Sequence, residues 1–109
     1  MPKWTQAGAI ALCRLVERYA PVAGCHVALT GGCLYKDGDR ADCDLIFYRV
    51  RQVKQIDIQK LLELLQYRVG FDHITGGGWR YIGYFNGMKV DLLFPEAPAS
   101  ASDDYEKSR

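Results

Sequence analysis

The dipeptide formed by Asn86 and Gly87 constrains the fold of this chain more than any other feature. It stands between two strand-like runs, residues 79–85 and 88–94, which are rich in aromatic and β-branched residues. Asn-Gly is the preferred two-residue type I′ turn because both positions tolerate a positive φ. Such a turn fixes the register of an antiparallel hairpin. The expected pairs are Phe85 with Met88, Tyr84 with Lys89, Gly83 with Val90 and Ile82 with Asp91.

Two helices and two strands are expected before the hairpin. Apolar residues at helical spacing predict helices over residues 4–19 and 58–69, with Thr5 and Asp57 as their N-caps. Gly70 follows the second helix as its C-cap. The expected strands span residues 25–30 and 42–50.

This order of helix, strand, strand, helix and hairpin predicts a small α/β (α+β) protein, in which a mixed β-sheet carries helices packed on one face. A chain of 109 residues suffices for one hydrophobic core, so we expect a single domain over residues 1–95. Residues 96–109 lack periodicity and are rich in alanine, serine and charged residues, which predicts a flexible C-terminal tail. We expect the three glycines 76–78 to form a loop, with His73 just before it.

Three aspartates, Asp42, Asp44 and Asp91, stand inside otherwise apolar strands. Aspartate is depleted from strands, and a partly buried carboxylate without a partner is costly. Asp42 and Asp44 share one face of their strand, opposite Cys43. Carboxylates at this spacing, with a third from a neighbouring strand, suit a hard divalent cation such as Mg²⁺. Alternatively, the aspartates form ion pairs or lie on an exposed strand face; the candidate cations are Arg49, Arg80 and Lys89.

A pair of glycines, Gly31 and Gly32, follows the strand 25–30 and precedes a short helical turn expected over 33–36. Backbone N–H groups in such a turn can bind a phosphate. Leu29-Thr30-Gly31-Gly32, then Asp42-Cys43-Asp44-Leu45 after nine residues, and later Val90-Asp91-Leu92, together resemble the nucleotidyltransferase-fold superfamily. That superfamily includes DNA polymerase β, the CCA-adding enzymes and the minimal nucleotidyltransferases, and the resemblance extends over residues 4–94.

The resemblance implies an enzyme that transfers a nucleoside monophosphate from an NTP, ATP by default, to an acceptor hydroxyl by two-metal phosphoryl transfer. Asp42, Asp44 and Asp91 would be the catalytic residues and would bind two Mg²⁺ ions, with Mn²⁺ as a substitute. Gly31 and Gly32 would contact the triphosphate. Further phosphate contacts are expected from Cys33, Lys36, Arg40 and Arg80.

The chain departs from the family in two respects. Many members have serine where this chain has Cys33, and a thiol is the weaker hydrogen-bond donor, so phosphate binding is expected to rely on backbone amides and on Lys36 or Arg40. Family enzymes usually add a domain that binds the acceptor. Here we expect a dimer mate, a partner chain or the loops of this chain to hold the acceptor, which is a nucleic acid or a protein.

The formal net charge of +1 excludes a global attraction to nucleic acid or to an anionic membrane. No apolar stretch approaches the roughly 20 residues that a bilayer requires, and no export signal is recognisable. We therefore expect a cytoplasmic protein that does not associate with membranes. Its cysteines are expected to be free thiols: Cys13, Cys25, Cys33 and Cys43.

Several other side chains have a functional and a plain structural interpretation. A base could stack on a tyrosine, although strand tyrosines usually pack in the core or at its rim; the candidates are Tyr35, Tyr81 and Tyr84. His73 is a candidate general base or a surface residue. The basic cluster after the second strand is a solvated connection or a contact for nucleic acid; it comprises Arg49, Arg51 and Lys54.

Two further functions compete with the enzyme. The first is a non-catalytic nucleotide-binding module of the same fold, such as an antitoxin-like partner of another protein. The second is a small α/β scaffold whose strand aspartates pair with arginines. The three intact acids favour the enzyme, whereas the small size favours the module.

Overall fold

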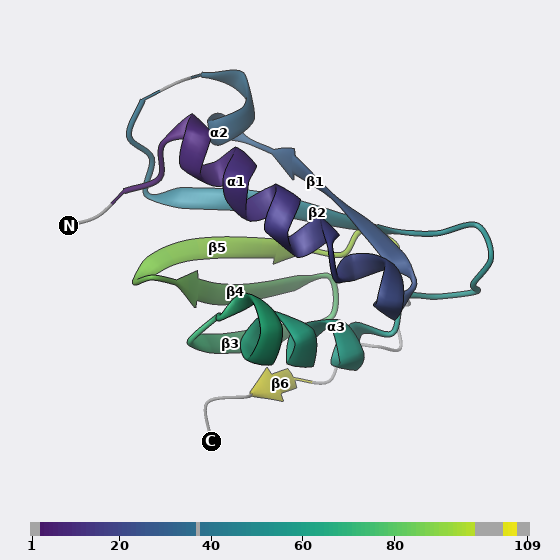
Figure 1. Ribbon diagram of the computed structural model, residues 1–109. Helices are drawn as coiled ribbons and strands as arrows, with labels where there is room; N and C mark the ends of the chain where they lie inside the picture. The colour runs from purple at the N-terminus through teal and green to yellow at the C-terminus, as the bar shows by residue number, and fades with distance from the viewer. Residues whose placement is uncertain (1–2, 37, 98–103, 107–109) are drawn as a thin grey trace.

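The computed structural model describes residues 3–36, 38–97 and 104–106. Within these residues a mixed sheet of six strands has the order β1-β2-β5-β4-β3-β6 (Figure 1). The strands are β1 Cys25–Thr30, β2 Asp42–Arg49, β3 His73–Gly77, β4 Arg80–Phe85, β5 Met88–Leu93 and β6 Asp104–Glu106. The helices are α1 Gln6–Glu17, α2 Gly32–Tyr35 and α3 Ile58–Leu64, with a 3₁₀ turn at Ala20–Ala23 and a π-helical turn at Leu65–Val69.

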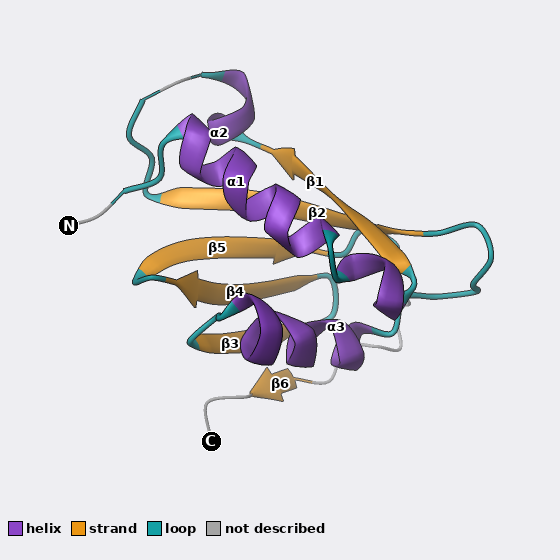
Figure 2. Ribbon diagram, in the orientation of Figure 1, coloured by secondary structure: helices purple, strands orange, loops and turns teal. Residues whose placement is uncertain are grey.

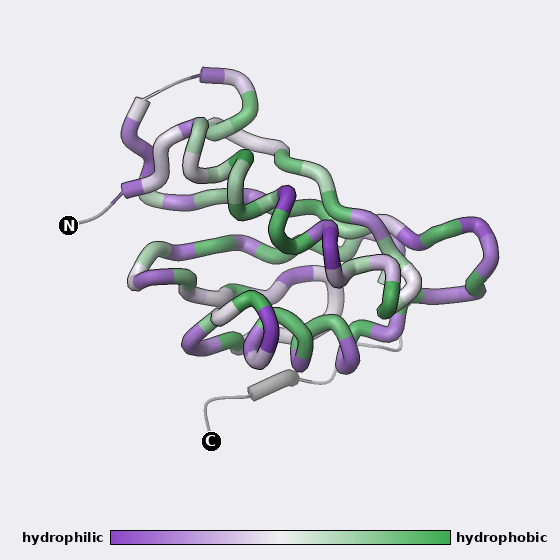
Figure 3. Tube along the Cα trace, viewed as in Figure 1, coloured by the Kyte–Doolittle hydropathy of each residue, from purple (hydrophilic) through white to green (hydrophobic). Residues whose placement is uncertain are grey.

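The helices lie on one face of the sheet, as Figure 2 shows, and the core fills the space between the two layers. Inward-facing residues of β2 alternate with outward-facing polar ones, so Leu45 and Phe47 are fully buried against helical residues such as Leu61 and Leu62. Figure 3 shows the resulting alternation of hydrophobic and hydrophilic residues along the strands. The predicted fold class, a small mixed sheet with helices on one face, is therefore confirmed.

Both helix N-caps form as predicted. The Thr5 hydroxyl accepts a hydrogen bond from the Gly8 N–H, and the Asp57 carboxylate accepts one from the Lys60 N–H at 3.1 Å. α1 begins at Gln6 rather than at Trp4, because Trp4 is held elsewhere. The Trp4 backbone pairs with Arg40, and its buried indole N–H donates to the carbonyl oxygen of Lys89 at 2.7 Å. Trp4 thus attaches the N-terminal segment to the start of the β2 and β5 strands.

The hairpin has the predicted register throughout: Phe85 pairs with Met88, and Ile82 pairs with Asp91. Asn86 has a φ of 53° and Gly87 a φ of 78°, as a type I′ turn requires. β5 also pairs with β2, in parallel, and this pairing places Asp44 directly opposite Asp91. β5 is therefore the central strand that joins the hairpin to the first half of the chain.

The prediction of a loop at residues 76–78 is wrong, because His73–Gly77 form strand β3 and only Gly78 remains in the turn. Glycine lowers the strand propensity of such a segment, but pairing with β4 outweighs that effect. A Cβ at Gly76 would stand 2.6 Å from the Arg80 carbonyl oxygen, so the close approach of the two backbones requires glycine there.

The segment expected to be a tail contains β6, whose backbone pairs with Thr75, Gly76 and Gly77 of β3. The remaining residues beyond 97 lie outside the described part of the chain. None of the described helices has the length and apolar character needed to cross a membrane.

Candidate functional site

The uncovered face of the sheet brings two of the three strand aspartates together. Asp44 and Asp91 are direct partners on the parallel strands β2 and β5, so their side chains leave the same face of the sheet. Asp91 is 6% exposed. The two carboxyl groups are close enough to interact, and this interaction acts on the pKa of Asp44.

The pKa of Asp44 is raised to about 6 in this position. Burial is the largest cause, followed by the hydrogen bond to Asp91 and the negative charges of Asp91 and Asp42, while Arg80 acts in the opposite direction. The carboxyl pair therefore carries less than its full negative charge in the free protein near pH 6.

Two cations compensate the carboxylates. The Arg80 guanidinium donates to Asp91 at 3.1 Å, and Lys89 Nζ lies 3.7 Å from an oxygen of Asp42. Arg80 thus forms an ion pair with Asp91, as the alternative interpretation of the strand aspartates predicts. Arg49 takes no part, because its guanidinium donates to the Val53 carbonyl at the other end of β2.

The glycine turn packs directly on this carboxyl pair. Gly31 has a φ of +73° with ψ near −157°, a backbone conformation that is essentially restricted to glycine. A Cβ there would overlap Asp44 Oδ2. The backbone at the end of β1 therefore approaches Asp44 as closely as possible.

Arg40 packs against Gly32, the second glycine of the turn. A Cβ at Gly32 would come within 3.3 Å of Arg40 Nε, which places the guanidinium against the turn. The Nε atom is buried and finds no hydrogen-bond partner among the described residues. The site thus combines a glycine turn, a cation with an unused donor and a carboxyl pair.

The glycine turn is followed by the short helix α2, which contains Cys33 and ends just before Lys36. The Cys33 side chain is 1% exposed, and its thiol donates to the Asp42 carbonyl oxygen, so it points into the core rather than toward a ligand. Burial and Asp44 raise its pKa, which keeps the thiol protonated. Only the backbone N–H of Cys33 is left for the phosphate contact expected from the sequence. Lys36 is exposed after α2.

Among the tyrosines, Tyr81 is a core residue: it is buried and its ring packs edge-on against Phe94. Tyr35 is 81% exposed on α2, and Tyr84 is 37% exposed on the uncovered face of the sheet. His73 lies on β3 beside Tyr84 rather than in a loop, with ring centroids 6.4 Å apart. Tyr81 is therefore excluded as a stacking residue, whereas Tyr35 and Tyr84 remain accessible.

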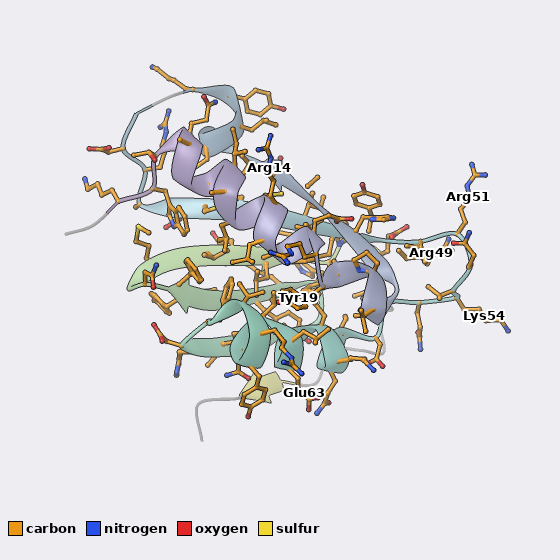
Figure 4. All side chains as sticks on the ribbon, in the orientation of Figure 1. Arg14, Tyr19, Arg49, Arg51, Lys54 and Glu63 are labelled. Atoms are coloured by element: carbon orange, nitrogen blue, oxygen red, sulfur yellow. The ribbon has the colours of Figure 1, made fainter. Side chains whose placement is uncertain are left out.

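The basic cluster of Arg49, Arg51 and Lys54 lies at the opposite end of β2 from Asp42. Figure 4 shows Arg51 and Lys54 pointing outward from the loop that follows this strand. At about 3.3 Å per residue, the ends of β2 are about 23 Å apart. This cluster cannot contact a phosphate bound at the glycine turn.

Two of the three carboxylates suit a divalent cation. Asp44 and Asp91 are adjacent, the negative charge of Asp91 opposes the ionisation of Asp44, and a cation beside Asp44 would favour its charged form. Asp42 faces Lys89, and in the described part of the chain no three His, Cys, Asp or Glu side chains converge closely enough to hold a metal. The Asp42–Lys89 contact is longer than a hydrogen bond, and both groups are partly exposed, so this pair is weak. The donor set of carboxylate oxygens is the one that Mg²⁺ prefers.

Sequence reasoning named Lys89 among the possible partners of the strand aspartates but did not assign it to Asp42, and it missed that Lys3 and Met88 lie beside this pair. The predicted hairpin register already placed Lys89 opposite Tyr84, so its presence on this face could have been found. The position of Lys3 depends on the pairing of Trp4 with Arg40, for which the sequence carries no signal.

Replacing Asp44 by asparagine should change how stability depends on pH. Because the folded protein raises the pKa of Asp44, it binds this proton more tightly than the unfolded chain does, and the parent loses stability as the pH rises from about 4 to about 6. Asp44→Asn removes this loss. We expect the variant to have a higher urea midpoint than the parent at pH 7.5, with the difference shrinking toward pH 4. Asp72→Asn, at an exposed position, is the control; a difference that is equal at both pH values would contradict the assignment.

No family model matches this sequence, and no curated protein matches it. The fold and the geometry of the site therefore carry the functional argument.

Proposed function

We propose that this protein is a nucleotidyltransferase that transfers a nucleoside monophosphate from an NTP, with ATP as the default donor, to an acceptor hydroxyl. One observation carries the proposal: a glycine-only turn at Gly31 packs directly on Asp44, which lies directly opposite Asp91 on the neighbouring strand. A turn that can approach a phosphate and a carboxyl pair that can hold a cation are the two parts that phosphoryl transfer needs in contact. The resemblance to the nucleotidyltransferase-fold superfamily supports the same assignment.

The residues of the chain have distinct tasks in this proposal. The backbone N–H groups of Gly31 and Gly32 would contact the triphosphate, and Arg40 lies against this turn with an Nε donor that has no partner among the described residues. Asp42 and Asp44 share the uncovered face of β2 and would hold the cation that accompanies the triphosphate, with Asp91 opposite Asp44 on β5. Bound Mg²⁺, or Mn²⁺ in its place, supplies charge stabilisation for the reacting phosphate and for the departing pyrophosphate. Asp91, from the neighbouring strand β5, would complete the site on the acceptor side, where the attacking hydroxyl is activated.

A second candidate is the non-catalytic module of the same fold. The observation that favours it is the engagement of Asp91 by Arg80 and of Asp42 by Lys89, because these ion pairs neutralise the carboxylates without a metal. In this alternative the chain binds a nucleotide or a partner protein but catalyses no transfer.

The test is calorimetric titration of the double variant Asp42→Asn with Asp44→Asn against Mg²⁺ and each NTP. We expect Mg²⁺-dependent NTP affinity to be lost, because the amide groups cannot replace the charge of the two carboxylates. Asp72→Asn should bind as the parent does. Parental affinity in the double variant would show that these aspartates are not the metal site. NTP binding by the parent without transfer to any acceptor would favour the non-catalytic module.

A further inference from the structure

A cavity of about 300 Å³ opens beside Asp42, on the side of the carboxyl pair away from the glycine turn. Its walls include Lys3, Asp42, Tyr84, Met88 and Lys89. The strand order explains its position: Gly31 follows β1, on one side of β2, whereas Lys89 and Tyr84 come from β5 and β4, on the other. A ligand in this cavity and a phosphate at the glycine turn would approach the aspartates from opposite sides.

The size and the walls of the cavity restrict what it can hold. A volume of about 300 Å³ is at the lower end of the range for ligand pockets, so the cavity can hold one small molecule or one residue of a larger ligand. Tyr84 is 37% exposed and offers an aromatic ring on which a flat ring can stack, and the His73 ring lies beside it with centroids 6.4 Å apart. Met88 also lines the cavity, although it packs against the core as well.

Two ammonium groups at the cavity favour a ligand that carries negative charge. Lys3 is exposed at the cavity, and the contact of Lys89 Nζ with Asp42, at 3.7 Å, is longer than a hydrogen bond, so both ammonium groups can bind an anion. An aromatic surface beside two cations suits a nucleotide, whose base stacks and whose phosphate pairs with lysine.

We propose that this cavity binds the acceptor and that the acceptor is a nucleotide, either free or at the end of a nucleic acid chain. The inference rests on the proposed transfer reaction. The acceptor hydroxyl oxygen forms a bond to the α-phosphorus of the NTP, the bond from that phosphorus to the bridging oxygen breaks, and pyrophosphate leaves with the electron pair. The hydroxyl proton passes to a carboxylate of the site and then to solvent.

The test measures binding without metal, which separates the cavity from the carboxylate site. The probes are the nucleoside 5′-monophosphates, the matching nucleosides, inorganic phosphate and N-acetyl-tyrosinamide, titrated in EDTA and followed by NMR. We expect a monophosphate to bind at least about tenfold tighter than its nucleoside or phosphate alone. Tyr84→Ala should weaken it by about tenfold or more, as loss of a stacking partner does. Lys3→Ala should weaken monophosphate but not nucleoside binding.

The control is Tyr48→Ala, which removes an exposed tyrosine of β2 that does not line the cavity and should leave binding unchanged. In Mg²⁺, an α,β-methylene NTP should bind together with the monophosphate. Displacement of the monophosphate by that analogue would overturn the proposal, because the cavity would then belong to the donor. Tight binding of N-acetyl-tyrosinamide with no preference for phosphate would also overturn it and would indicate a protein acceptor.

Failure of this inference is distinguishable from failure of the proposed function. If the parent protein binds no monophosphate but shows Mg²⁺-dependent NTP binding, only the acceptor role of the cavity is overturned. Monophosphate binding without any NTP binding would overturn the transfer reaction and the acceptor role with it.

Discussion

Replacing Asp91 by asparagine is expected to lower the rate of nucleotidyl transfer by about a hundredfold or more, a loss of about 3 kcal/mol of transition-state stabilisation. Asp91 is the one aspartate of the site that comes from β5, and it is also the most buried. In the proposed reaction, Asp42 and Asp44 hold the cation that accompanies the triphosphate, and Asp91 completes the site on the acceptor side. An interaction on the acceptor side is realised mainly in the transition state, so its removal lowers turnover more than ground-state binding.

The measurement is single-turnover transfer together with NTP titration, after labelled NTP and cell extract have identified an acceptor. NTP affinity should change by less than about tenfold in Asp91→Asn, because the change leaves Asp42 and Asp44 intact. Arg80 loses its partner but remains partly exposed, so the variant should fold, which a thermal melt checks. Unchanged turnover, or a loss of NTP binding as complete as in the strand β2 double variant, would refute this division of roles.

Gly31→Ala is expected to abolish most NTP affinity, whereas Gly32→Ala, in the same turn, is expected to lower it much less. At Gly31 the backbone conformation disfavours any side chain by about 1–3 kcal/mol, and the added methyl would displace Asp44. At Gly32 the φ is not positive, and the nearest atom is Nε of the flexible Arg40 side chain at 3.3 Å. We therefore expect at least about a tenfold loss of Mg²⁺-dependent NTP affinity in the first variant and a much smaller loss in the second.

Urea denaturation of the same pair separates stability from binding. Gly31→Ala should be less stable than the parent by about 1–3 kcal/mol, and Gly32→Ala should stay within about 0.5 kcal/mol. A folded Gly31→Ala protein that binds Mg²⁺ and NTP as the parent does would show that the turn is not part of the site.

Local signals in the sequence were sufficient for the elements with strong turn or cap chemistry. The hairpin register could be predicted residue by residue, because Asn86 and Gly87 permit only one closure of the two strands. Thr5 and Asp57 marked the helix starts for a similar local reason. The sharing of one strand face by Asp42 and Asp44 follows from the period of a strand alone.

Tertiary contacts determined what could not be predicted. Gly76 and Gly77 have low strand propensity, yet β3 forms because β4 lies against it. The pairing of β6 with β3 joins segments far apart in the sequence. At the site, the position of Arg40 beneath Gly32 and the contact of Lys89 with Asp42 depend on how the loop after α2 and strand β5 meet β2. The sequence named Arg40 and Lys89 as candidates, but their exact contacts depend on the tertiary structure.

The parallel pairing of β2 with β5 has a consequence for how the site comes into being during folding. Parallel neighbours cannot be joined by a tight turn, and here α3, β3 and β4 intervene in the chain. Closing so long a loop costs entropy before the contacts compensate, so this pairing should form late. Asp44 and Asp91 face each other across it, and any partly folded chain therefore lacks the site. A ligand bound there would hold together the last contact to form and would raise the stability of the whole sheet.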